Sequence, residues 1–101
     1  MFSSRLKSEQ ADRLAEAFLC LETAEDCYRL FEDLFTIREV QDLAQRLEVA
    51  LLLNKKATYT EIVEKTGVST ATIGRINRAL NYGAGGYSMV LERLHDEDTD
   101  E

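Results

Sequence analysis

The feature that most constrains the fold of this chain is a series of helix start and stop signals in a sequence that contains no proline. The segments 36–39 (TIRE) and 58–61 (TYTE) both fit the capping box, in which a threonine hydroxyl and a glutamate carboxylate each accept a hydrogen bond from a helix-start N–H. Segment 23–26 (TAED) is a weaker version of it, while Gly67 and a glycine cluster at 83–86 mark breaks. With apolar residues at helical spacing between them, these signals predict an all-α chain without strands. The expected helices span about 5–20, 24–34, 37–54, 59–66, 70–80 and 87–94.

The composition indicates one small helical domain rather than a membrane or secreted protein. The chain has 101 residues, 45% of them hydrophobic, and we expect a single domain over residues 1–94 followed by a disordered acidic tail over 95–101. No apolar run approaches the ~20 residues that a membrane helix needs, and the N-terminus does not resemble a secretory signal. We therefore expect a cytoplasmic protein without a membrane partner. Cys20 and Cys27 are expected to be small buried side chains, and with His95 as the single histidine no metal site is expected.

The formal charge of −7 is unevenly distributed along the chain. Residues 1–52 hold six basic and eleven acidic side chains, and residues 95–101 hold five acidic ones. Residues 53–94 hold six basic and three acidic side chains, a local charge of +3. The overall acidity argues against a nucleic-acid partner, but the segment 53–94 has the sign that such a partner requires.

The most informative stretch is 59–80 (YTEIVEKTGVSTATIGRINRAL), which predicts a helix-turn-helix. Gly67 can supply the left-handed turn residue, and Ser69 can cap the second helix. The residues expected to pack the two helices together are Ile62, Val63, Thr66, Val68, Ile73 and Ile76. Small side chains, hydroxyls and arginines face outward and can contact bases or phosphates. These candidate DNA-binding residues are Ser69, Thr70, Ala71, Gly74, Arg75 and Arg78, with Lys55, Lys56 and Lys65 placed for phosphates. The alternative is a packing hairpin with a solvated basic face.

Several segments resemble a known family. They are 34–36 (LFT), the run 44–48 (AQRLE), the segment 67–75 with TATI at 70–73, and the exit 80–83 (LNYG). Together they are similar to the core of the tryptophan repressor superfamily, and within it to the TrpR-related proteins of the YerC/YecD type. The resemblance implies six helices, an intertwined homodimer formed by the N-terminal helices, and operator binding through two helix-turn-helix heads about 34 Å apart.

The resemblance also implies an effector site. In the tryptophan repressor two arginines enclose the indole ring, and two threonines belong to the same region; the matching positions here are Arg46, Arg75, Thr36 and Thr72. Ile76 stands where the repressor has a glycine that leaves space for the ligand, and Ala79 replaces a serine that helps to receive it. Both changes count against L-tryptophan, so no cofactor or known effector is predicted. Two alternatives stay open for the two arginines. They pair with acidic side chains (Glu39, Asp42, Glu48) or DNA phosphates, or they bind the carboxylate of another small effector.

These observations lead to two hypotheses of different kinds. The first is a homodimeric, DNA-binding transcriptional regulator, expected to be a repressor, that places the helix at 70–80 in the major groove of double-stranded DNA. The alternative is a protein-interaction module that kept the TrpR-like fold without DNA binding, which the overall acidity favours. An enzyme is not expected, because no histidine, thiol or carboxylate pair has catalytic spacing and the glycines at 83–86 do not lie between a strand and a helix.

Overall fold

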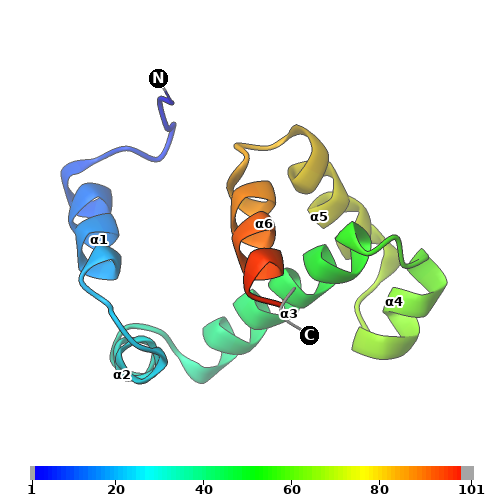
Figure 1. Cartoon of the computed structure of the whole chain (residues 1–101), viewed down its shortest axis with the longest axis horizontal. Coiled ribbons are helices and arrows are strands. Elements are labelled where there is room, and N and C mark those ends of the chain that lie inside the picture. The colour runs from blue at the N-terminus through cyan, green and yellow to red at the C-terminus, as the bar shows by residue number, and fades with distance from the viewer. Residues whose placement is uncertain (1, 99–101) are drawn as a thin grey trace. The chain divides into compact units, whose positions relative to one another are not determined.

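The computed structural model describes residues 2–98, and within this range the chain is helical without any strand (Figure 1). The helices are α1 (Glu9–Leu19), α2 (Ala24–Leu34), α3 (Ile37–Asn54), α4 (Tyr59–Thr66), α5 (Thr70–Tyr82) and α6 (Gly86–Asp98). The predicted all-α fold with six helices is therefore confirmed for the described residues. The chain divides into two compact units, Met1–Val40 and Gln41–Glu101.

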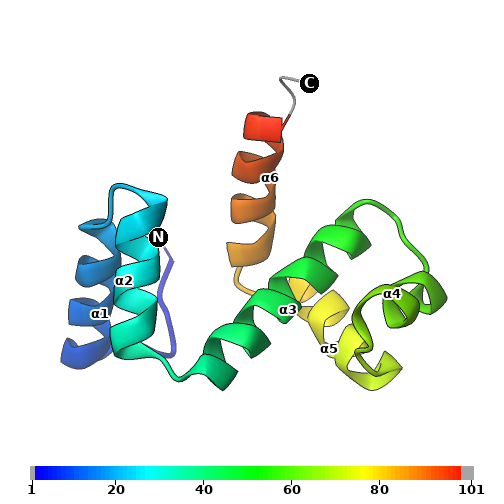
Figure 2. The same ribbon diagram turned by 90° about the horizontal axis from the view of Figure 1, so that it is seen from below.

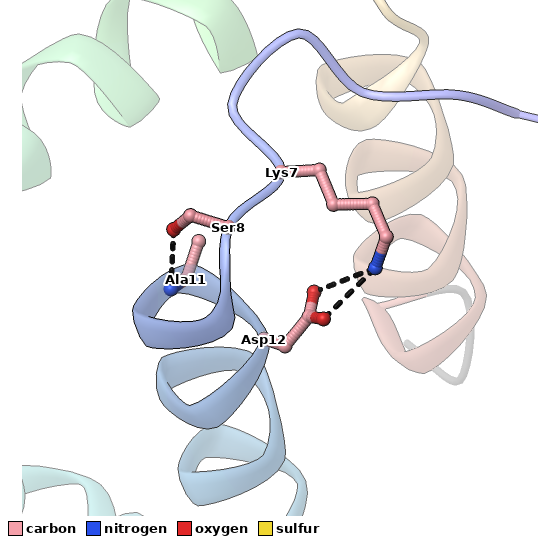
Figure 3. A network of polar contacts seen from close by, with 4 residues as sticks. All are labelled: Lys7, Ser8, Ala11 and Asp12. Carbon is pink, nitrogen blue, oxygen red and sulfur yellow. Dashed lines mark hydrogen bonds and ion pairs between the residues drawn. The ribbon is translucent and has the colours of Figure 1, made fainter.

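The first unit contains α1, α2 and the first turn of α3, and local capping determines where its helices begin. The Ser8 hydroxyl accepts a hydrogen bond from the Ala11 N–H at 3.0 Å, and the Lys7 ammonium pairs with the Asp12 carboxylate at 2.8 Å (Figure 3). Helix α1 thus begins at Glu9, later than the expected position 5, because Ser8 is the residue that caps it.

Helix α2 has the capping box that its sequence predicts. The Thr23 hydroxyl accepts a hydrogen bond from the Asp26 N–H, and the Asp26 carboxylate in turn accepts from the Thr23 N–H. A further hydrogen bond from the Glu22 backbone N–H is the main cause that holds the pKa of Asp26 below its ordinary value. The start of α2 is therefore fixed by contacts that lie entirely within residues 22–26.

The first unit buries no side chain, although its helices are amphipathic. Leu6 is 74% exposed and Leu19 is 84% exposed. Leu14, Phe18 and Leu34 are also exposed, and no described residue from 2 to 40 is buried. Cys20 is exposed and Cys27 is half-buried, so the prediction that both are buried is wrong for this single chain. The apolar side chains of this unit are therefore not buried by packing within the unit itself.

The second unit has the hydrophobic core of the chain. The buried members are Val49, Ala50, Leu52, Ile62, Val68, Ile73, Ile76 and Leu91, so α3, α4, α5 and α6 all contribute. Helix α5 packs against both α4 and α6. The C-terminal half of α3 lies next to the α4–α5 pair in both views (Figures 1 and 2). The predicted central position of the third helix is confirmed for this half.

The glycine cluster ends α5 and precedes α6. Helix α5 continues to Tyr82, two residues beyond the expected end, and stops at Gly83, where a side chain would collide with the carbonyl oxygen of Ala79. Gly85 has a left-handed backbone (φ 89°), and α6 begins directly after it. Helix α6 extends to Asp98, beyond the expected end at 94; the rest of the predicted acidic tail, residues 99–101, lies outside the described residues. None of the helices described is long and apolar enough to cross a membrane.

The start of α4 provides a direct test of the capping argument. The Thr58 hydroxyl accepts a hydrogen bond from the Glu61 N–H at 3.1 Å, and the Glu61 carboxylate accepts one from the Thr58 N–H at 2.8 Å. We expect Thr58→Ala to lower the free energy of unfolding by about 1 kcal/mol, because it leaves a helix-start N–H without its acceptor. Urea denaturation at a fixed protein concentration measures the change.

The matched control is Thr60→Ala, which removes the same groups from an exposed position in the same turn of α4. We expect the control to change stability by less than about 0.5 kcal/mol, since surface substitutions outside caps have small effects. Equal stability of the two variants would contradict a structural role for the capping box.

Candidate nucleic-acid interface

A tight turn around Gly67 joins α4 to α5. Gly67 has a left-handed backbone (φ 75°), and its N–H donates to the Val63 carbonyl oxygen at 2.8 Å. The Thr66 hydroxyl donates to the Ile62 carbonyl at 2.7 Å and accepts from the Val68 N–H at 3.2 Å. The turn is therefore held by both backbone and side-chain hydrogen bonds, as the sequence predicts for Gly67.

The first residues of α5 form a second set of local hydrogen bonds. The Ser69 hydroxyl caps the helix by accepting from the Thr72 N–H at 3.2 Å, and it also bonds the Thr72 hydroxyl at 3.1 Å. Arg75 Nη2 donates to the Thr72 hydroxyl at 3.2 Å. The predicted N-cap is confirmed. Because Ser69 already serves as the cap, its hydroxyl has less capacity for an external partner than the sequence suggests.

The outer side of α5 presents small and basic residues. The predicted contact residues that lie exposed are Ser69, Thr70, Ala71, Arg75 and Arg78, together with Lys55, Lys56 and Lys65 outside the helix. Gly74 is half-buried, but apart from its chain neighbours and the backbone of its own helix no atom lies within 4 Å of the place where a Cβ would stand. The fold therefore does not require glycine at this position, even though glycine costs about 1 kcal/mol relative to alanine inside a helix.

The charge near the start of α4 comes from side chains of both signs. Lys55 and Lys56 are exposed just before the helix, and Lys56 has a left-handed backbone (φ 70°). The hydrogen bond from the Thr58 N–H is the main cause that lowers the pKa of Glu61 below its ordinary value. Glu61 is thus ionised at neutral pH, and it places a negative charge at the same helix end that the two lysines approach.

Three residues on this surface escaped the sequence analysis. Asn77 and Asn81 lie one turn apart on α5 and line a shallow groove together with Gly74, Arg78 and Tyr82. Tyr59, the first residue of α4, is within hydrogen-bond distance of Asn77. The spacing of Asn77 and Asn81 from Gly74 puts all three on one helical face, so this signal was present in the sequence. Nothing in the sequence indicates that Tyr59 lies beside α5.

A separate cavity of about 430 Å³ contains most of the predicted effector residues. It is lined by Asp42, Gln45, Arg46, Thr72, Arg75, Ile76, Ala79 and Tyr87. Arg46, Thr72 and Arg75 are thus brought together, with Ile76 and Ala79 in the same wall. Thr36 does not line the cavity: it caps α3, accepting from the Glu39 N–H at 3.0 Å. The described residues contain no cluster of three or more side chains suited to a metal ion.

Comparisons with known proteins agree on one family. Residues 9–95 match the family model for the Trp repressor protein. The uncharacterized protein YerC of Bacillus subtilis (strain 168) is 48% identical over 96 residues, which cover 95% of this chain and 92% of that protein. The crystal structure of a TrpR-like protein from Eubacterium eligens aligns with a TM-score of 0.85 and 49% identity, covering 90% of this chain and 94% of the other.

A second solved structure gives the same result. A candidate Trp repressor from Staphylococcus aureus aligns with a TM-score of 0.84 and 43% identity, over 90% of this chain and 91% of that one. Sequence and backbone therefore agree over nearly the whole length of the chain, and the resemblance found in the sequence is confirmed: the chain belongs to the Trp repressor family.

Proposed function

We propose that this protein is a homodimeric, DNA-binding transcriptional repressor in the bacterial cytoplasm. The observation that carries the proposal is the α4–Gly67–α5 arrangement, in which buried residues fix two short helices and the outer side of α5 is exposed, small and basic. In this proposal α4 and α5 form a helix-turn-helix and α5 enters the major groove. The membership in the Trp repressor family supports it.

Each predicted residue has a role that follows from its position. The residues proposed to lie nearest base edges are Ser69, Thr70, Ala71, Gly74 and Arg75. Those proposed to contact phosphates are Lys55, Lys56, Lys65 and Arg78. Arginine can bond guanine bidentately, while small residues allow the helix backbone to approach the bases closely.

The proposed homodimer rests on the uncovered apolar side chains of the first unit. Leu14 and Phe18 belong to one stripe of α1, yet they are 46% and 40% exposed. A protein rarely leaves such a face open to water, because each buried leucine or phenylalanine contributes about 1.5–3 kcal/mol. A second copy of the same unit supplies the matching apolar surface, and two-fold symmetry then presents two α5 helices to DNA.

The cavity beside Arg46 is the proposed place of any effector. Arg46 and Arg75 supply positive charge there, which suits a carboxylate. Ile76 and Ala79 lie in its wall, and in our proposal they disfavour L-tryptophan because they fill space and remove a hydroxyl. Because Asp42 lines the same cavity and offsets part of this charge, we propose only that an effector at this place carries a carboxylate and is not L-tryptophan.

The DNA-binding proposal is tested by titrating the protein against a duplex selected from a random pool. Arg78→Ala removes one phosphate contact from each half-site of the proposed dimer, so it should weaken binding at least 10-fold and reduce the magnitude of the log–log salt slope by about two units. Fluorescence anisotropy at several salt concentrations measures both quantities. Arg29→Ala, an exposed arginine of α2, is the control and should change neither quantity.

A protein that binds no duplex in a salt-dependent manner would contradict DNA binding. Recovery of a stable protein partner in that case, unaffected by Arg75→Ala or Arg78→Ala, would favour the alternative of an interaction module.

Gly74 allows stability and DNA binding to be separated. Because a Cβ at this position meets no atom within 4 Å beyond its chain neighbours and the backbone of its own helix, we expect Gly74→Ala to stabilise the protein by about 0.5–1 kcal/mol. The same methyl group stands between α5 and the proposed base edges, so DNA affinity should fall at least 10-fold. Urea denaturation and anisotropy on the same preparation measure the opposite effects. Unchanged affinity would remove Gly74 from the proposed interface.

The homodimer is tested by placing a charge in the apolar stripe of α1. We expect Leu14→Asp to convert the protein to a monomer, since an unpaired carboxylate in a hydrophobic interface is strongly unfavourable. Sedimentation equilibrium measures the mass, and the adjacent exposed Arg13→Asp is the control for charge alone. A monomeric wild-type protein at micromolar concentration would contradict the proposed assembly.

A further inference from the structure

A chain of hydrogen bonds crosses from α5 to the start of α4 on the outer side of the pair. Asn81 Nδ2 donates to the carbonyl oxygen of Asn77 at 2.9 Å and to its Oδ1 at 3.0 Å. Asn77 Nδ2 donates to the hydroxyl of Tyr59 at 3.4 Å. The last of these bonds links α5 to α4 through two residues that are 18 positions apart in the sequence.

The chain of hydrogen bonds has a direction. Asn77 uses its amide oxygen to accept from Asn81 and its amide nitrogen to donate to Tyr59. The phenol oxygen of Tyr59 is therefore an acceptor within the protein, and among the described residues no group accepts the phenol proton. Tyr59 is 38% exposed, so this proton can be donated to solvent or to a partner outside the chain.

The surroundings of Tyr59 indicate the chemistry of that partner. Tyr59 is the first residue of α4, and the first helix of a helix-turn-helix crosses the sugar–phosphate backbone. The exposed Lys55 and Lys56 lie just before it and attract an anion. The Glu61 carboxylate occupies the N-terminal end of the helix, so the helix end is a poor anion site and a side-chain donor is needed.

Building on the DNA binding proposed above, we infer that the Tyr59 hydroxyl donates a hydrogen bond to a backbone phosphate of DNA, and that Asn77 and Asn81 are positioning residues for this phenol. Donation to a phosphate makes the phenol oxygen a better acceptor, which strengthens the long bond from Asn77. The contact adds affinity without adding charge, since the phenol is neutral.

The experiment compares Tyr59→Phe, Asn77→Ala and the double variant on the selected duplex. Tyr59→Phe should weaken binding at least 10-fold with an unchanged salt slope, because one hydrogen bond to a charged phosphate is lost in each half-site but no cation is removed. Asn77→Ala should weaken binding less. The double variant should bind as Tyr59→Phe does, because Asn77 acts through the phenol.

A scan of the duplex with single uncharged methylphosphonates identifies the phosphate. One position in each half-site should weaken binding of the wild-type protein but have little effect on Tyr59→Phe. Tyr28→Phe, which makes the same change on the exposed Tyr28 of α2, should bind as wild type. Thermal unfolding of all variants shows whether a loss of affinity comes from a loss of fold.

The outcomes separate this inference from the DNA-binding proposal. If the wild-type protein binds no DNA, both are wrong. If the wild-type protein binds and Tyr59→Phe binds equally well, only the present inference is overturned. Losses that add in the double variant would show that Asn77 acts by itself, and they would overturn its positioning role.

Discussion

The small core shared by α3, α4, α5 and α6 is the constraint on which the rest of the structure depends. Ile62 and Ile73 are fully buried on opposite sides of the Gly67 turn, and each contributes about 1.5–3 kcal/mol by leaving water. Neither α4 nor α5 can rotate about its axis without exposing one of these side chains. The core therefore decides which face of α5 is turned outward. A rigid outer face is what a recognition surface requires, since less ordering is then needed when a partner binds.

The two units differ in how far they bury their apolar side chains. Residues 41–94 bury eight apolar side chains within one chain, whereas the described residues up to 40 bury none. Helices such as α1 and α2 are only 11 residues long and are marginal in isolation, so their order depends on tertiary contacts. If a second copy provides those contacts, as we propose, the stability of the first unit depends on protein concentration. Protein concentration then also controls the fraction of dimer, the form that presents two α5 helices to DNA.

The sequence predicted the local features and most of the apolar side chains that pack α4 against α5, but not the polar contact between these two helices. Capping boxes at residues 23, 36 and 58 were confirmed because all their partners lie within four residues. The start of α1 was misplaced because residues 3, 4 and 8 are all serines, and only the three-dimensional course of the chain shows that Ser8 is the cap. The end of α5 was misplaced because several glycines compete to end a helix, and the collision at Gly83 depends on the backbone of the preceding turn. The end of α6 was misplaced because the acidic segment after residue 94 was expected to be a tail rather than helix.

The candidate site shows the same limit. The exposed residues of α5 follow from helical periodicity, and most of the predicted contact residues are indeed exposed. Asn77 and Asn81 share that face, but asparagines in a helix give no signal of function by themselves. Tyr59 is recognised as a candidate only from the structure, because the crossing of α4 and α5 brings residues 59 and 77 together. Contacts of this kind depend on the angle between two helices, and a single sequence does not specify that angle.

The acidity of the chain gives these neutral residues a particular importance. A protein with a charge of −7 repels DNA at long range, so each added cation has to overcome part of that repulsion. Neutral donors such as a phenol or an amide contribute hydrogen bonds to DNA without depending on counterion release. In the proposed interface the cations of residues 53–94 attract the phosphates locally, and the neutral donors fix the register on the duplex. In an acidic regulator, neutral donors can therefore add affinity and define the docking geometry without adding to the salt dependence.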